Sequence, residues 1–263
     1  MTNHSKLRIS HKTKELHIAY KQLTGTKEAS LIFFGGFHSS MNGTKATALY
    51  NYCESNNLNL ILFDYLGHGE SDGIFTDYNI SDWYQNCIDT MNQLTPPNKP
   101  LIIIGSSMGA WLMLLVALSY PHKISHLISL AGAPDFTESL IFEKLTIIQK
   151  DELYKYNQLT ISFNINNDYS YIITKNLIED GRKHLLLNQK FINIESPITL
   201  IHGMNDNIVP YNTSITLAEK VKSQNVILHL IKSSDHSLSD DVSLSTLFQS
   251  VEEAIGQTTT DVK

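Results

Sequence analysis

The segment Gly105–Gly109 reads Gly-Ser-Ser-Met-Gly and has the form G-x-S-x-G. It follows the apolar run Leu101–Ile104, which is typical of a strand, and it precedes a helix-length stretch. In this context the central serine lies on a strained turn that lifts its hydroxyl above the edge of a sheet. The positive end of the following helix dipole points at the same place. The motif therefore predicts Ser107 as the nucleophile of an acyl-transfer site, in preference to its neighbour Ser106.

An acyl-transfer site must also stabilise an oxyanion with hydrogen-bond donors. One donor is the backbone N–H of the residue after the nucleophile, here Met108, and the other comes from the loop after an early strand. The apolar run Leu31–Phe34 ends at two glycines, and Phe37 follows them. We therefore expect the N–H of Phe37 to be the second donor. The alternative is a glycine turn that only ends a strand.

The base of such a site follows the last strand of the sheet. His236 comes shortly after the apolar run Val226–Ile231, so we expect it to take the proton of Ser107 and return it to the leaving group. Other histidines follow earlier strands. We expect His202 and His68 to be structural.

The acid that orients the base lies between the nucleophile and the base in the chain. Asp206 lies in the loop after the apolar run Ile198–His202, and this order favours it as the partner of His236. Asp135, which follows the apolar run Leu127–Leu130, is the rival acid. A turn-forming role is the alternative for Asp206, because aspartate is common in turns.

The elements that must position these residues are short apolar runs alternating with helix-length segments. The runs expected to be core strands are Leu31–Phe34, Leu60–Phe63, Leu101–Ile104, Leu127–Leu130, Ile198–His202 and Val226–Ile231. The expected helices are Thr44–Glu54, Ser81–Leu94, Ser107–Ser119 and Thr213–Lys222, the last with Asn212 as its N-cap. Continuous apolar strands that alternate with helices predict a mostly parallel, doubly wound sheet with helices on both faces, an α/β fold.

The two ends of the chain carry further expected elements. Two weak strands, Leu7–Ser10 and Leu16–Ala19, are expected to form an antiparallel edge of the sheet. Near the other end, Leu244–Ile255 is expected to be a closing helix, and Gly256–Lys263 a polar tail.

Residues 135–195 interrupt the alternation with helical patterning and many polar residues. We interpret them as a small cap insertion within one domain that spans residues 1–263. The aromatic residues of this insertion form either the wall of an acyl pocket or a small local core; they are Tyr154, Tyr156, Phe163, Tyr169 and Tyr171.

Composition and the remaining motifs exclude several classes of partner. The net charge is −6 and no block of like charges occurs, so no nucleic-acid footprint is present. There is no zinc-protease or phosphate-loop motif, and Gly67, Gly69 and Gly73 do not have the spacing of a dinucleotide fingerprint. We therefore expect no metal and no cofactor. The two cysteines, Cys53 and Cys87, are expected to be thiols.

The sequence also carries an expectation about location. Met1–Ser10 is polar and lacks the apolar segment of a secretory signal. The apolar run Ala110–Leu118 is too short for a bilayer, which needs about 20 residues. We therefore expect a cytosolic protein without a membrane span.

Taken together, five segments resemble the α/β-hydrolase domain-containing protein ten subfamily of palmitoyl-protein thioesterases and acyl-glucuronide esterases. The segments are GGFHSSMNGTKA, LILFDYLGHGESDG, IGSSMGAWLML, LIHGMNDNIVP and SSDH. The resemblance implies the α/β-hydrolase fold and an esterase or thioesterase activity, with nucleophile, acid and base at Ser107, Asp206 and His236. Ala110 departs from the family pattern, where a second glycine is expected, and Phe37 stands in place of tyrosine.

These observations lead to one expected mechanism and three alternatives. We expect two-step acyl transfer, in which Ser107 attacks the carbonyl of an ester or acyl thioester and water then hydrolyses the acyl-enzyme. The alternatives are a peptidase and a carbon–carbon hydrolase, both with the same triad, and a non-catalytic binding protein on the same fold.

Overall fold

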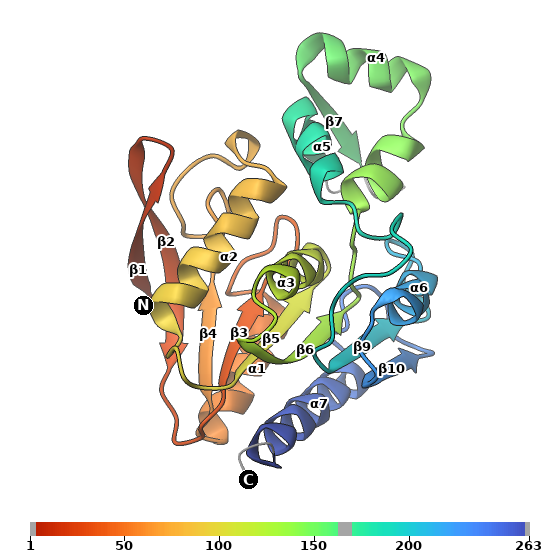
Figure 1. Cartoon of the computed structure of the whole chain (residues 1–263). Helices are drawn as coiled ribbons and strands as arrows, with labels where there is room; N and C mark the ends of the chain where they lie inside the picture. The colour runs from red at the N-terminus through yellow and green to blue at the C-terminus, as the bar shows by residue number, and fades with distance from the viewer. Residues whose placement is uncertain (1–3, 163–169, 261–263) are drawn as a thin grey trace.

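The computed structural model describes residues 4–162 and 170–260 (Figure 1). Its centre is an eight-stranded sheet in the order β1-β2-β4-β3-β5-β6-β9-β10. The strands are β1 (Ser5–His11), β2 (Lys14–Leu23), β3 (Ser30–Phe34), β4 (Asn59–Phe63), β5 (Leu101–Ser106), β6 (Ile124–Leu130), β9 (Ile198–Gly203) and β10 (Val226–Ile231). The strands from β4 to β10 in this order are parallel, whereas β1 and β2 form the expected antiparallel edge. The expected mostly parallel α/β fold is confirmed.

Helices cover both faces of this sheet (Figure 1). One face packs against α2 (Ile80–Leu94), α3 (Met108–Ser119) and α6 (Asn212–Lys220). The other face packs against α1 (Thr44–Ser55) and α7 (Asp241–Thr260). The strands are apolar on both sides because both sides are covered. In β3, for example, Ile32 and Phe34 belong to the first core and Leu31 and Phe33 to the second.

The chain leaves the sheet after β6 and returns to it at β9, and the segment between them is the insertion. It lies over one end of the sheet (Figure 1). It contains η2 (Thr137–Ile141), η3 (Phe142–Lys144), α4 (Ile147–Tyr156), β7 (Gln158–Ser162), β8 (Ser170–Thr174), α5 (Lys175–Gly181) and η4 (Arg182–His184). The helical patterning holds for α4 and α5, but the antiparallel hairpin β7–β8 was not expected. Its strands are short and largely exposed, so they lack the continuous apolar signal that marks the central strands.

Two details of the C-terminal helices correct the sequence analysis. Asn212 is not the N-cap of α6 but its first residue, because the N–H of Thr213 already donates to the carbonyl oxygen of Pro210 at 2.8 Å. The closing helix α7 does not end at Ile255 but continues to Thr260, the last described residue. The hydroxyl of Thr258 donates to the carbonyl oxygen of Ile255, so a polar side chain is accommodated within the helix. The rest of the expected tail lies outside the described residues.

Candidate active site

Ser107 lies on the sharp turn between β5 and α3. Its φ of 54° and ψ of −117° are unusual for a residue with a side chain. The turn is held by the main chain around it: the N–H of Ser107 donates to the carbonyl oxygen of Leu130 at 2.9 Å, and its own carbonyl oxygen accepts from the N–H groups of Ala110 and Ala133. These bonds keep the serine at the carboxyl end of the central strands.

The two glycines of the G-x-S-x-G motif are required by close packing at this turn. A Cβ atom on Gly105 would lie 2.6 Å from the Cα atom of Ala110, and one on Gly109 would lie 2.0 Å from the carbonyl oxygen of Phe34. Neither distance leaves room for a side chain. The motif therefore reflects the approach of α3 to the ends of β3 and β5.

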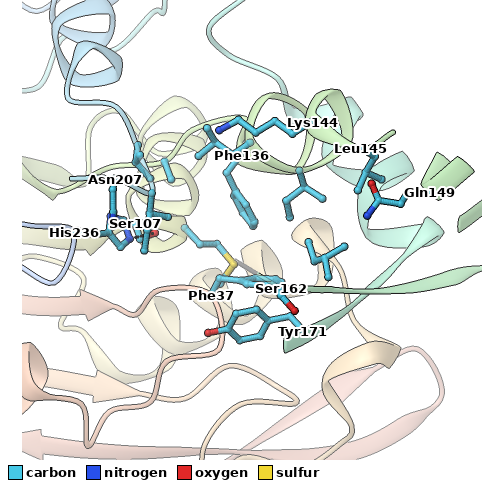
Figure 2. Close-up of a pocket in the computed structure, with 17 residues that line it drawn as sticks. Phe37, Ser107, Phe136, Lys144, Leu145, Gln149, Ser162, Tyr171, Asn207 and His236 are labelled. Carbon is cyan, nitrogen blue, oxygen red and sulfur yellow. Dashed lines mark hydrogen bonds between the residues drawn. The ribbon is translucent and has the colours of Figure 1, made fainter. Parts of the chain in front are cut away.

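The structure brings together three residues that the sequence analysis nominated from distant segments. The Nε2 atom of His236 lies 3.1 Å from the Oγ atom of Ser107, and its Nδ1 atom lies 2.7 Å from the Oδ2 atom of Asp206. Figure 2 shows Ser107 and His236 side by side at one end of a cavity. A carboxylate at Nδ1 places the ring proton there, which leaves Nε2 to accept the serine hydroxyl.

Asp206 is held by four hydrogen bonds. Its Oδ1 atom accepts from the N–H groups of Ile208 (2.9 Å) and Val209 (2.8 Å), and its Oδ2 atom accepts from His236 and from the Nε2 atom of His202 at 3.1 Å. Burial by itself would raise the pKa of Asp206, but the hydrogen bonds from the two histidines outweigh burial and hold this pKa well below its usual range. The carboxylate is therefore ionised throughout the neutral range.

His202 was expected to be structural. In the structure its ring contacts Asp206, the residue that faces His236. It is fully buried, and its Nε2 atom faces two acceptors, the carboxylate of Asp206 and the carbonyl oxygen of Val209 at 3.0 Å. Nε2 therefore carries the proton, and the hydroxyl of Ser214 donates to Nδ1 at 2.7 Å. His202 is thus a donor that orients Asp206. The only signal in the sequence is a histidine at the end of a strand, four positions before the acid.

The rival acid, Asp135, points elsewhere. Its two carboxylate oxygens accept from the N–H groups of Leu186 (2.8 Å) and Leu187 (2.7 Å), shortly after η4. Burial raises the pKa of Asp135, and these two N–H groups act in the opposite direction. This carboxyl group fastens the start of the insertion to the segment that follows η4.

Phe37 and Met108, the residues expected to supply the oxyanion donors, line the same cavity as Ser107. Met108 is the first residue of α3, so its N–H has no acceptor within the helix. The loop after β3 passes directly beside Ser107, because a Cβ atom on Gly36 would lie 3.4 Å from the Cβ atom of Ser107. Phe37 follows in this loop, and its ring packs edge-on against Phe136 at a centroid distance of 5.2 Å.

A cavity of about 430 Å³ extends from Ser107 beneath the insertion (Figure 2). Most of its wall is apolar, and the apolar side chains include Phe37, Phe136, Leu140, Ile141, Leu145 and Ile161. Of the aromatic residues of the insertion, Tyr171 lines this cavity, whereas Tyr154 and Tyr156 are 42% and 60% exposed. Phe163 and Tyr169 lie outside the described residues. A cavity of this size and lining suits an apolar acyl group.

Two histidines lie near this wall: His68 is buried, whereas the side chain of His38 is partly exposed. His38, which the sequence analysis did not single out, has a positive φ of 55° and stacks on Phe75 at a centroid distance of 3.5 Å. Burial lowers the pKa of His38 to about 4. His68 packs edge-on against Trp83, and burial lowers its pKa to about 3. Both rings are therefore neutral at pH 7 and extend the aromatic wall rather than supplying charge.

The described residues offer neither a metal site nor a membrane-spanning helix. Within residues 4–162 and 170–260, no group of three or more histidine, cysteine, aspartate or glutamate side chains is arranged to hold a metal ion. None of the described helices combines the length and apolar character needed to cross a bilayer.

The parallel sheet and the serine at the sharp turn after β5 define the class of an α/β hydrolase. The family described as serine aminopeptidase, S33, matches residues 25–176, which is more than half of the chain. The resemblance noted from the sequence is confirmed, because the chain belongs to the α/β-hydrolase family, in the group of the ABHD10 proteins. It is 34% identical over 246 residues to a human relative named palmitoyl-protein thioesterase ABHD10, mitochondrial; the match covers 94% of this chain and 79% of the relative.

Solved structures agree with this assignment. ABHD10 from mouse superposes with a TM-score of 0.85 at 30% identity, and the match covers 96% of this chain and 99% of the mouse chain. A crystal structure of a protein from Agrobacterium vitis S4 superposes with a TM-score of 0.89 at 28% identity, and the match covers 96% of this chain and 98% of the other. The chain is therefore a hydrolase of this family.

The names of the relatives correct one expectation. The curated relatives from human, cattle and rat are named mitochondrial proteins, whereas the sequence analysis expected a cytosolic one. That expectation was wrong on this comparison. It was drawn from the polarity of Met1–Ser10 and the shortness of the apolar run Ala110–Leu118, and neither feature assigns a compartment.

Proposed function

We propose that this hydrolase cleaves acyl thioesters or carboxylic esters through an acyl-enzyme on Ser107. The observation that carries the proposal is the continuous hydrogen-bonded series from the hydroxyl of Ser107 through His236 to Asp206, at 3.1 and 2.7 Å. Each distance lies within the reach needed for proton transfer. The order of these residues in the chain is the order that the fold uses.

In the proposed mechanism, His236 removes the proton of Ser107 as the hydroxyl attacks the substrate carbonyl. The N–H groups of Phe37 and Met108 stabilise the oxyanion, and loss of one such donor costs about 10²–10³ in rate elsewhere. His236 then protonates the leaving alcohol or thiol. Water, activated by the same histidine, releases the acid from Ser107.

The proposed substrate follows from the shape of the site and from the relatives. The cavity of about 430 Å³ offers an apolar wall to an acyl chain, and residues 135–195 are proposed to act as a cap over it. The ABHD10 relatives are named palmitoyl-protein thioesterases. Thiols and activated alcohols leave with less protonation than amines do, which favours thioesters and esters over peptides.

The test combines labelling with turnover. The purified protein and its Ser107→Ala variant are reacted with a fluorophosphonate probe, and both are assayed on acyl thioesters and nitrophenyl esters of increasing chain length. We expect only the wild type to be labelled, and kcat to fall by about 10⁶ in the variant, because the nucleophile is lost.

Ser106→Ala is the matched control, since the neighbouring serine keeps the same local sequence and should still be labelled at Ser107. Amino-acid anilides in the same panel test the peptidase alternative that the S33 description raises. A wild type that is not labelled and hydrolyses no ester contradicts the proposal.

A further inference from the structure

A second cavity, of about 260 Å³, opens at the same nucleophile. Ser107 and His236 line both this cavity and the acyl cavity, so the reacting bond lies where the two spaces meet. A substrate held by its acyl chain in the apolar cavity must place its other half somewhere. The second cavity is the space beside His236, the residue that protonates the leaving atom.

More hydroxyl-bearing residues line this second cavity than line the first. Hydroxyl-bearing residues contribute to it from three segments; they are Ser39 and Ser40, Thr44, and Ser237 and Ser239. None of the residues that line it is aspartate or glutamate. The described wall thus offers donors and one cation, Lys45, but no negative charge of its own.

The first turn of α1 forms one side of this cavity. Gly43 precedes the helix without a side-chain cap, and no acidic residue lies in the first turn. The first N–H groups of a helix lack intrahelical acceptors and carry the positive end of the dipole. A lysine at this position is electrostatically unfavourable for the helix, yet Lys45 is the second residue of α1.

The ammonium group of Lys45 is held in place. Its Nζ atom donates to the carbonyl oxygen of Ser237, the residue after the proposed base, across 192 positions of sequence. Burial lowers the pKa of Lys45 to about 8, although Asp235 and Asp206 act in the opposite direction. A cation that has lost part of its hydration, in a cavity lined by further hydrogen-bonding residues, gains most from an anionic ligand.

We propose that the second cavity is the leaving-group subsite, and that Lys45 together with the first turn of α1 binds an anionic group, a carboxylate or a phosphate, on the departing thiol or alcohol. This inference rests on the proposed function. It makes Lys45 a specificity-determining residue for the half of the substrate that the acyl cavity does not hold.

The test uses pairs of thioesters with the same acyl chain, at the length that turns over fastest. The acyl thioester of 3-mercaptopropionate is compared with that of its methyl ester, which keeps the thiol and removes the charge. A third arm uses the thioester of 2-mercaptoethyl phosphate. We expect the wild type to favour the anionic substrates in kcat/KM, and Lys45→Met to reduce this preference by about 10- to 100-fold, the range of a charge-assisted hydrogen bond.

Two further variants sharpen the result. Lys45→Arg keeps the charge and should keep much of the preference. Lys21→Met is the matched control, because Lys21 donates to Asn42 outside the cavity and its loss should leave the preference as it is. The rates of the two anionic substrates are then compared. The faster one shows whether the cavity recognises the carboxylate of 3-mercaptopropionate or the phosphate of 2-mercaptoethyl phosphate.

Three outcomes would overturn the inference while leaving the hydrolase intact. They are equal kcat/KM for charged and methylated substrates in the wild type, a preference that survives Lys45→Met, and a loss in that variant that is the same for both substrates. The last would mean that Lys45 acts only by holding the Ser237 carbonyl beside His236. A wild type that hydrolyses none of these thioesters would instead contradict the proposed function, and the proposed subsite would fail with it.

Discussion

At the scale of single residues, the site depends on which carboxylate faces His236. Asp206 accepts from both His236 and His202, and its low pKa follows from these bonds. Asp135 is also buried and ionisable, but it accepts from two main-chain N–H groups of the insertion. The two aspartates therefore have different partners, and isosteric substitutions distinguish their roles.

Replacing Asp206 by Asn is expected to lower kcat by about 10⁴, because the amide no longer fixes the ring proton of His236 on Nδ1. Asp135→Asn leaves the contacts of His236 untouched and should change kcat by less than about tenfold. Ester turnover normalised to the folded fraction, determined by circular dichroism, measures both, since this correction removes losses from misfolding. A larger loss in Asp135→Asn than in Asp206→Asn would make Asp135 the acid.

At the scale of elements, the insertion is fastened to the sheet domain by buried polar contacts. Asp180, at the end of α5, accepts from the main-chain N–H of Ser81 at 2.7 Å and from its hydroxyl at 2.9 Å, in the first turn of α2. A carboxylate is favourable at that end of a helix. The insertion thereby has a defined position over the apolar cavity.

The far wall of this cavity should set the acyl chain length. Leu145 is buried and lies at the end of the cavity away from Ser107 (Figure 2). We expect Leu145→Trp to shift the optimum to shorter chains: kcat/KM for a sixteen-carbon thioester should fall by about tenfold or more, and that for a four-carbon thioester by less than about threefold, because the larger ring occupies space at the distal end.

Chain-length profiles of the two proteins measure this shift. Ile147→Trp is the control, since Ile147 is 80% exposed and does not line the cavity. An unchanged profile in Leu145→Trp would show that the acyl chain does not reach this wall.

At the scale of the whole molecule, stability comes from two apolar cores, one on each face of the sheet. Burying one large apolar side chain contributes about 1.5–3 kcal/mol to the free energy of unfolding. The many buried strand residues therefore make the largest favourable contribution. Neutral histidines are buried in these cores as well. They make the free energy of unfolding depend on pH.

His68 should destabilise the protein in acid. Its pKa is about 3 in the folded protein and about 6.5 when unfolded, so between these values only the unfolded chain binds the proton. The contribution of neutral His68 to the free energy of unfolding is fully present above pH 6.5. It is lost as the pH falls from 6.5 towards 3, by about 1.4 kcal/mol per pH unit.

His68→Phe keeps a ring of similar size and removes the titration. Urea unfolding at a series of pH values should therefore show a shallower loss of stability below pH 6.5 in the variant than in the wild type. His38, with a pKa lowered to about 4, remains in both proteins and serves as the common background. Parallel curves for the two proteins would contradict the assignment.

Much of the fold could be predicted from sequence because its signals are local. The central strands are marked by apolar runs, and each of the six runs expected to be core strands lies within a strand of the sheet, with ends differing by up to three residues. The insertion was less predictable. The hairpin β7–β8 has short, exposed strands, and its pairing depends on neighbours rather than on composition.

For the site, the sequence by itself determined the sharp turn at Ser107 and the order of the candidate nucleophile, acid and base. A strained turn and its two glycines leave a local pattern around Ser107. The catalytic roles of the three candidates stay predictions for the experiments above. Only the tertiary structure decided that Asp206 rather than Asp135 faces His236, that His202 supports Asp206, and that Lys45 lies beside Ser237. The reason is physical: the direction of a buried side chain is set by contacts between segments far apart in the chain, and such contacts leave no periodic trace in either segment.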